Sequence, residues 1–305
     1  MEHKQIDLKG MKNIFRFTLM AAILCCTSVA FAQGDYDKYE KDNETYGTTP
    51  YINLSDMPRL YNCMPAHPAF DSPEFSYDIL RYCWGKQQRT GERIEIAKAD
   101  AEWDNLEKVY ANWKDAFGLA VTKESTPNIY HFLNKSLRTT DPTRRDIKAQ
   151  YFRIRPFRYY GETTASGEDE ELYNEGSYPS GHTLRGWTIT LLMIQIAPKQ
   201  AEALYKRGMD YGYSRVIVGA HWQTDVDNSR MGASMLFSVL QSNADFQADL
   251  VKAQQEYKEK TGADIGQARD SKGGNGNTQI YNINGTPAAE STRGVFIANG
   301  QKIVK

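Results

Sequence analysis

Apolar residues recur at helical spacing through most of this chain, and this pattern limits the fold more than any other feature of the sequence. From residue 76 to residue 257 they fall three or four positions apart, as in Leu184, Trp187 and Leu191, the spacing that gives a helix one apolar face. Regular alternation of apolar and polar residues, which is typical of half-buried strands, is nearly absent there. We therefore expect one all-α domain over residues 76–262.

The segments on either side of this region lack the helical pattern. Residues 33–75 are rich in Tyr, Asp, Asn and Pro, and the prolines interrupt any regular element, so we expect an extended N-terminal arm. Residues 263–278 contain DSKGGNGN, which has the composition of a flexible linker. In residues 279–305, Asn299 and Gly300 separate two strand-like runs, which predicts a short β-hairpin.

Residues 1–32 have the features of a secretory signal peptide. Lys12 and Arg16 precede an apolar stretch over residues 17–30, and the sequence up to Ala32 supplies a small-x-small cleavage site. A membrane anchor is the alternative, but the stretch is shorter than the ~20 residues that a spanning helix needs, and it contains polar side chains. We expect export to the periplasm, and no transmembrane segment in the mature chain.

The charge of the chain is balanced, with 37 Lys and Arg against 38 Asp and Glu. Proteins that bind nucleic acid neutralise its phosphates with an excess of basic residues. We therefore expect no nucleic-acid partner, and any positive charge that matters must be local.

Two cysteines, Cys63 and Cys83, remain after the signal peptide is removed. An even pair in an exported protein is a candidate disulfide. Two separate buried thiols are the alternative, because two cysteines carry no diagnostic spacing. They do not form a metal motif.

A first basic segment, KAQYFRIRPF, carries Lys148 and Arg155 seven positions apart. This is close to two helical turns, so both cations can project from one face, and Pro156 would end that helix. The alternative is a solvated basic helix face. Arg153 and Arg158 fit that alternative better.

A second segment, GSYPSGHT, places Ser180 and Gly181 at the expected start of a helix that runs to about Ile196. Free backbone N–H groups and the positive end of the helix dipole make such a turn an anion site. Gly181 lets an oxygen approach the backbone closely, and His182 follows with a titratable proton. The alternative is a capped helix start with an incidental histidine.

A third segment, SRVIVGAHWQTD, carries Arg215, His221 and Asp225. The spacing of four between His221 and Asp225 would put the carboxylate one helical turn from the imidazole. There it can accept the Nδ1 proton and leave the lone pair of Nε2 free to act as a nucleophile. The alternative is a surface His and Asp pair.

An acidic stretch, GETTASGEDEELYNEGS, lies between the first two segments. It contains Gly and Ser and has no apolar face, so we expect a loop. Its position in the chain allows it to cover the site.

The order K-x6-R-P, P-S-G-H and S-R-x5-H-x3-D resembles that of the type 2 phosphatidic acid phosphatase superfamily. The longer strings, GSYPSGHT above all, resemble the bacterial class A non-specific acid phosphatases, over about residues 54–259. The matching residues are Lys148, Arg155, Pro156, Pro179, Ser180, Gly181, His182, Ser214, Arg215, His221 and Asp225.

This resemblance implies a compact helical bundle that hydrolyses phosphomonoesters of many kinds, without a metal or other cofactor, and that also transfers phosphate to alcohols. It further implies a homo-oligomer. Among the matched residues, it implies that His221 attacks phosphorus, that Asp225 orients it and that His182 protonates the leaving alcohol. The implied phosphate-binding residues are Lys148, Arg155, Ser180, Gly181 and Arg215. Catalysis of phosphoryl transfer is mostly positioning and electrostatic stabilisation, which fixed cations can supply.

Three other functions fit parts of the pattern. A vanadate-dependent haloperoxidase uses the same cradle for vanadate, although the longer strings argue against it. A non-catalytic phosphate-binding surface protein would keep the cations, but it has no need of both histidines. An integral lipid phosphatase shares the motif, and it needs membrane spans that we do not expect here.

The C-terminal hairpin resembles a short form of the sorting tails used by type IX secretion. This resemblance implies that the type IX secretion machinery carries the protein to the cell surface or the medium. The alternative is a disordered tail.

Overall fold

The computed structural model describes residues 46–262 and, nearer the C-terminus, residues 280–282, 287–288, 295–298 and 301–304. The predicted signal peptide and the predicted linker lie outside the described residues. The chain divides into two compact units, Met1–Ile265 and Gly266–Lys305, and each is considered by itself.

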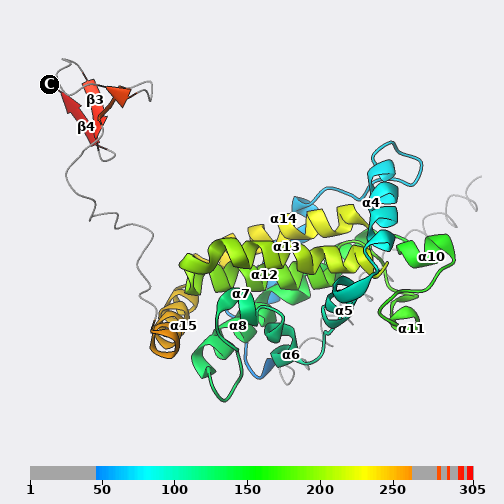
Figure 1. Ribbon diagram of the computed structural model, residues 1–305, viewed down its shortest axis with the longest axis horizontal. Helices are drawn as coiled ribbons and strands as arrows, with labels where there is room; N and C mark the ends of the chain where they lie inside the picture. Colours follow the sequence, from blue (N-terminus) through cyan, green and yellow to red (C-terminus); the bar gives the residue numbers. More distant parts are fainter. Residues whose placement is uncertain (1–45, 263–279, 283–286, 289–294, 299–300, 305) are drawn as a thin grey trace, which may run out of the picture. The chain divides into compact units, whose positions relative to one another are not determined.

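The regular elements in the described part of the first unit are all helices (Figure 1), which confirms the predicted all-α domain. None of the described helices is both long and apolar enough to cross a bilayer. The α-helices are α3 (Leu60–Cys63), α4 (Phe75–Gln87), α5 (Gly91–Ala99), α6 (Leu106–Ala111), α7 (Lys114–Phe117), α8 (Pro127–Thr140), α9 (Arg144–Gln150), α10 (Pro156–Tyr160), α11 (Asp169–Leu172), α12 (Gly181–Ile196), α13 (Ala201–Ile217), α14 (Gln223–Leu240) and α15 (Ala244–Thr261). Short 3-10 helices are η1 (Leu54–Asp56), η2 (Asp141–Thr143) and η3 (Pro198–Gln200).

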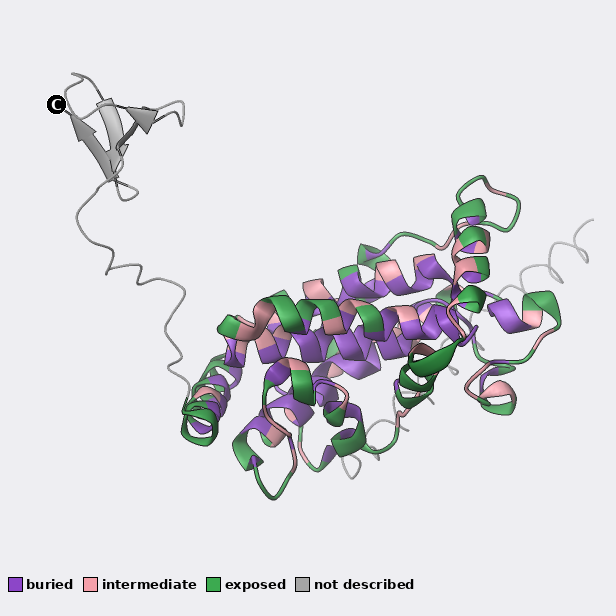
Figure 2. Ribbon diagram, viewed as in Figure 1, coloured by how far each residue is buried: buried purple, intermediate pink, exposed green. Residues whose placement is uncertain are grey.

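Helix α12 is the centre of this unit. It packs most extensively on α13 and α14, and Figure 2 shows that it is buried along almost its whole length. Glycine permits the close approach to α13, because a Cβ at Gly186 would lie only 2.3 Å from Cδ1 of Tyr211. Its buried polar residues, Arg185 among them, have partners in the neighbouring segments, as burial of polar groups requires.

The segment predicted to be an extended arm, residues 33–75, is described from residue 46 onward. There it holds only one-turn helices and irregular chain. Several of its side chains are buried nonetheless: Tyr46 and Tyr51 belong to the largest core cluster, and Leu60 to a second one. This part of the arm therefore packs against the helices and contributes to the core.

Cys63 and Cys83 are free and exposed, so the predicted disulfide is absent. Cys63 ends α3, which packs on α9, whereas Cys83 lies in α4, which packs on α13 and α14. The two thiols are thus carried by helices that pack on different parts of the unit. They are separate, as in the alternative interpretation, but they are not buried.

The second unit contains a four-stranded antiparallel sheet in the order β2-β1-β3-β4. The strands are β1 (Ile280–Asn282), β2 (Pro287–Ala288), β3 (Val295–Ala298) and β4 (Gln301–Val304). Ala298 pairs with Gln301 at the end of the β3–β4 ladder, which agrees with the predicted hairpin. The pairing of β1 with β2 was not predicted from the sequence. Asn299 and Gly300 lie outside the described residues.

Candidate active site

A pocket in the helical unit brings the three sequence segments together. It is lined by Lys148 and Arg155 from the first, Gly181 and His182 from the second and His221 from the third. Five predicted site residues therefore share one cavity, although 73 positions of sequence separate Lys148 from His221 (221 − 148).

His221 lies between α13 and α14 and is 2% exposed. Its Nδ1 lies 2.7 Å from the carbonyl oxygen of Ser177, and its Nε2 lies 3.0 Å from Nη1 of Arg155. A carbonyl can only accept and a guanidinium can only donate, so Nδ1 carries the proton and Nε2 carries the lone pair. Burial, followed by the charge of Arg155, lowers the pKa of His221 well below its usual value, which keeps the ring neutral.

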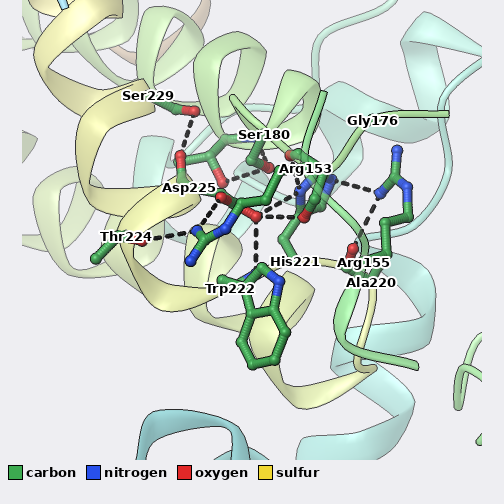
Figure 3. A network of polar contacts seen from close by, with 12 residues as sticks. Arg153, Arg155, Gly176, Ser180, Ala220, His221, Trp222, Thr224, Asp225 and Ser229 are labelled. Carbon is green, nitrogen blue, oxygen red and sulfur yellow. Dashed lines mark hydrogen bonds and ion pairs between the residues drawn. The ribbon is translucent and has the colours of Figure 1, made fainter. Parts of the chain in front are cut away.

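Asp225 does not lie one helical turn beyond His221, which corrects the sequence argument. The helix α14 begins only at Gln223, and Trp222 is its N-cap. Oδ2 of Asp225 accepts the backbone N–H of Trp222 at 2.9 Å and the hydroxyl of Ser177, and it lies 3.5 Å from Nδ1 of His221. The nearest acceptor for the Nδ1 proton is therefore the Ser177 carbonyl, and the Asp225 carboxylate lies second to it on the same side of the imidazole (Figure 3).

Arg153, which fitted a solvated helix face in the sequence analysis, is fully buried. Its guanidinium donates to Asp225 Oδ1 and to Asp78 Oδ2, both at 2.6 Å, and to Thr224 Oγ1 at 2.8 Å. Burial opposes the charge of Asp225, but Arg153, His221 and Ser177 together outweigh it, and the pKa of Asp225 falls well below its usual value. Arg153 therefore fixes the carboxylate that supports the His221 loop. Arg158, in contrast, is bonded to the Tyr173 carbonyl near the surface.

Lys148 and Arg155 meet in the pocket, but not on one helical face. The helix α9 ends at Gln150, and Pro156 is the first residue of α10, so the proline begins a helix where we expected it to end one. Nζ of Lys148 donates to the carbonyl of Gly176 at 2.6 Å. Burial, with the nearby charge of Arg155, lowers the pKa of Lys148 to about 7.

The α12 N-terminus has the predicted form. Ser180 is the N-cap. Its Oγ accepts hydrogen bonds from the backbone N–H of Thr183 at 3.3 Å and from the Thr183 hydroxyl at 3.0 Å. The helix ends at Ile196, as expected. Ser180 is buried beside the pocket residue Gly181 and does not line the pocket.

His182 follows in the first turn of α12 and is 8% exposed. Its Nε2 donates to the carbonyl of Ala101 at 3.0 Å, which leaves the lone pair on Nδ1. Burial, followed by the charge of Arg215, lowers the pKa of His182 well below its usual value. The ring is therefore neutral until an anion enters the site.

The acidic stretch forms part of the pocket wall. It contains α11, and Glu171, Leu172 and Glu175 line the cavity. Arg215 does not line it: both of its terminal nitrogens donate to Glu168, at 2.9 and 2.8 Å. The Nε of Arg215 is buried and has no hydrogen-bond partner within the described residues. Glu175 pairs with Arg155 through a single contact, from Nη2 to Oε2 at 3.3 Å.

Two further residues of the pocket wall, Trp103 and Arg144, were not predicted from the sequence. Arg144 precedes Lys148 by four positions in α9, a spacing that places side chains on one helix face and was available as a signal. Nothing in the local sequence marks Trp103. In the described ranges, no three His, Cys, Asp or Glu side chains are grouped so that they could hold a metal ion.

Comparison with known proteins places this site in a family. The model of the PAP2 superfamily matches residues 136–243, which include all the predicted site residues. A non-specific acid phosphatase of Providencia stuartii is 40% identical over 210 residues, or 68% of this chain and 84% of that protein. A non-specific acid phosphatase of Salmonella typhi is 34% identical over 199 residues (65% and 79%), and an acid phosphatase of Zymomonas mobilis is 29% identical over 249 residues (81% and 92%). The chain therefore belongs to the PAP2 superfamily, and it is an acid phosphatase.

Proposed function

We propose that the enzyme is exported and hydrolyses phosphomonoesters, without a metal, through a phosphohistidine on His221. One observation carries the proposal. The two partners of the imidazole have fixed roles, one as acceptor and one as donor, so the Nε2 lone pair is held toward Arg155 in a pocket lined by cations. An oriented, neutral imidazole beside cations is what attack on a phosphoryl group needs.

The first step forms a bond between Nε2 of His221 and phosphorus while the ester P–O bond breaks. The leaving oxygen takes a proton from His182, which the incoming phosphate dianion has helped to protonate. Water then attacks phosphorus, gives its proton to His182, and the P–N bond breaks to return Nε2. An alcohol in place of water would yield a new phosphomonoester.

Residues around the pocket would stabilise the negative charge that develops on the phosphoryl oxygens. Lys148 and Arg155 line it, the backbone N–H of Gly181 lies at the α12 N-terminus, and the unpartnered Nε–H of Arg215 is nearby in the same unit. Fixed cations and helix N–H groups stabilise such charge without any metal.

The covalent step is tested by rapid quenching with radiolabelled aryl phosphate, followed by peptide mapping. We expect an acid-labile, base-stable label on His221. His221→Ala should lose both label and turnover, whereas His182→Ala should still be labelled by substrates with good leaving groups and lose ~10²- to 10⁴-fold with poor ones. His131→Ala is the control, since His131 is half exposed beside Asp249. A label on His182 or on a serine would contradict the scheme.

Metal independence is tested separately. Activity should survive exhaustive chelation and should be inhibited by vanadate, which mimics the five-coordinate transition state. Loss of activity with chelator, restored by a divalent ion, would show that a metal takes part. Bromide oxidation by the vanadate-loaded protein with peroxide would instead reveal a haloperoxidase.

Export is supported by the sequence of residues 1–32, and sorting by the C-terminal sheet. We propose that the mature enzyme is periplasmic, or reaches the surface or the medium if the C-terminal unit acts as a sorting signal. Fractionation of cells that produce the full chain, with and without residues 266–305, tests both parts. Retention of the uncleaved chain in the cytoplasm would contradict export.

A further inference from the structure

The pocket holds a cation that the phosphoryl mechanism does not use. We propose that Arg144, held by Trp103, is a subsite for an anionic leaving group, and that the enzyme therefore favours phosphoanhydrides, in which a second phosphoryl group departs. This rests on the proposed function, in which His182 serves the leaving oxygen.

Arg144 lies in the first turn of α9, one turn before Lys148, and lines the same pocket as His182 and His221. Its stem passes close to the α12 N-terminus, because a Cβ at Gly181 would lie 3.0 Å from Cδ of Arg144. The guanidinium is thus beside the N–H groups that would bind the transferred phosphoryl, yet it comes from a different helix.

The guanidinium of Arg144 is held near His182 through Trp103. Nη1 of Arg144 donates to the carbonyl of Asp141 at 2.6 Å, and its guanidinium carbon lies 4.7 Å from the centre of the Trp103 ring. That ring in turn lies 4.8 Å from the ring of His182. Arginine and aromatic rings attract one another in this arrangement, so Arg144 is placed on the leaving-group side of the pocket.

Trp103 is itself held in place by a buried arginine. The buried Arg185 lies 3.2 Å from the centre of its ring and donates to its backbone carbonyl at 2.7 Å. Arg185 is anchored by Asp141, at 2.8 Å from Nε to Oδ2. The tryptophan is therefore a rigid support that does not need a substrate to hold it in place.

The charges facing the pocket favour an anion at this position. Its carboxylates come from α11 and the residues after it, and one of them, Glu175, already pairs with Arg155. The other, Glu171, has a raised pKa because of burial and the charges of Glu168 and Glu175. Under acid conditions the charge of Glu171 diminishes while the guanidinium of Arg144 stays charged.

With pyrophosphate as substrate, Nε2 of His221 would attack one phosphorus and the bridging P–O bond would break. The second phosphate leaves with the electron pair and takes its proton from His182. Arg144 would neutralise the other oxygens of that leaving phosphate, an interaction that a neutral leaving alcohol cannot make. The effect should therefore depend on the substrate.

The test compares kcat/KM for inorganic pyrophosphate with kcat/KM for an aryl phosphate whose leaving group is uncharged apart from its oxygen. In Arg144→Gln we expect the ratio of the two values to fall by roughly 10- to 100-fold, the effect of one charge-assisted contact. Arg144→Lys should restore part of the ratio. Arg145→Gln is the matched control, because Arg145 is the next residue of the same helix and does not line the pocket.

A ratio within twofold of wild type in Arg144→Gln would overturn the subsite, even if the aryl phosphate still labels His221. Failure of the proposed function is visible separately, as a wild-type enzyme that is labelled by neither substrate. If neither substrate labels the wild-type enzyme, calorimetric titration with pyrophosphate and with orthophosphate still tests whether Arg144 forms the subsite. Arg144→Gln should weaken pyrophosphate binding more than orthophosphate binding, and equal losses would refute the inference.

Discussion

The lowered pKa of Lys148 predicts the alkaline limit of the enzyme. Burial disfavours the charged ammonium and the neighbouring Arg155 repels it, so the pKa falls to about 7. The lysine therefore carries its charge below pH 7 and loses it above. In the proposed function the cations of this pocket bind the phosphoryl group, so kcat/KM should fall as the pH rises through 7.

The size of this fall follows from the titration. At pH 8.5 only about 3% of a group with a pKa near 7 is protonated, so kcat/KM should be roughly 30-fold below its value in acid. Removal of a fixed group that stabilises transition-state charge costs ~10²- to 10³-fold. Lys148→Met should therefore lose ~10²- to 10³-fold at pH 5.5 but much less at pH 8.5, and its profile should lack the fall around pH 7.

The assay is kcat/KM for an aryl phosphate between pH 4 and pH 9. Lys148→Arg should carry its charge throughout, and its alkaline fall should move above pH 8. Lys206→Met is the control, because Lys206 pairs with Glu202 on the exposed face of α13. The ionisation of the substrate is common to all variants and cancels in their ratio. If Lys148→Met keeps the fall around pH 7, another group causes it and the argument from burial is wrong.

Three further predictions concern stability and organisation. Arg153→Met should lower the free energy of unfolding by about 3–5 kcal/mol in chemical denaturation, because two buried carboxylates lose their cation; a change below 1 kcal/mol would contradict this. Gly186→Ala should cost about 1–3 kcal/mol, since the new methyl meets Tyr211 at 2.3 Å, whereas Gly176→Ala, with its nearest atom at 3.5 Å, should cost less. Removal of residues 263–305 should leave kcat and KM of the purified enzyme unchanged, and a loss of either would show that the C-terminal unit supports the site.

Periodicity was sufficient to predict the helices that bury apolar residues. The limits of α12 follow from Ser180 as the N-cap and from the apolar run to Ile196, both of which are local properties. The approach failed where a residue before proline was assigned to a helix. Arg155 is extended, with ψ 152°, as the ring of Pro156 requires, and the proline occupies the first helical position.

Partners distant in the sequence account for the other errors. Arg153 looked like one of several surface cations because its partner Asp78 lies 75 positions away in another helix. Trp103 enters the pocket from the chain between α5 and α6, and no spacing relates it to His182. Local patterns predict which residues have suitable chemistry, whereas burial and distant pairing are decided by how the helices pack.

Asp225 also determines how the site assembles. Its carboxylate joins the chain before α10 through Arg153, the chain before α12 through Ser177 and the chain before α14 through Trp222. The bond from Trp222 caps the N-terminus of α14 itself, whereas the bonds to Arg153 and Ser177 join stretches far apart in the sequence, so the geometry around His221 requires all three stretches to have docked. We therefore expect the reaction centre to be lost as one unit when the enzyme is denatured, so that activity should fall along the same curve as tertiary structure.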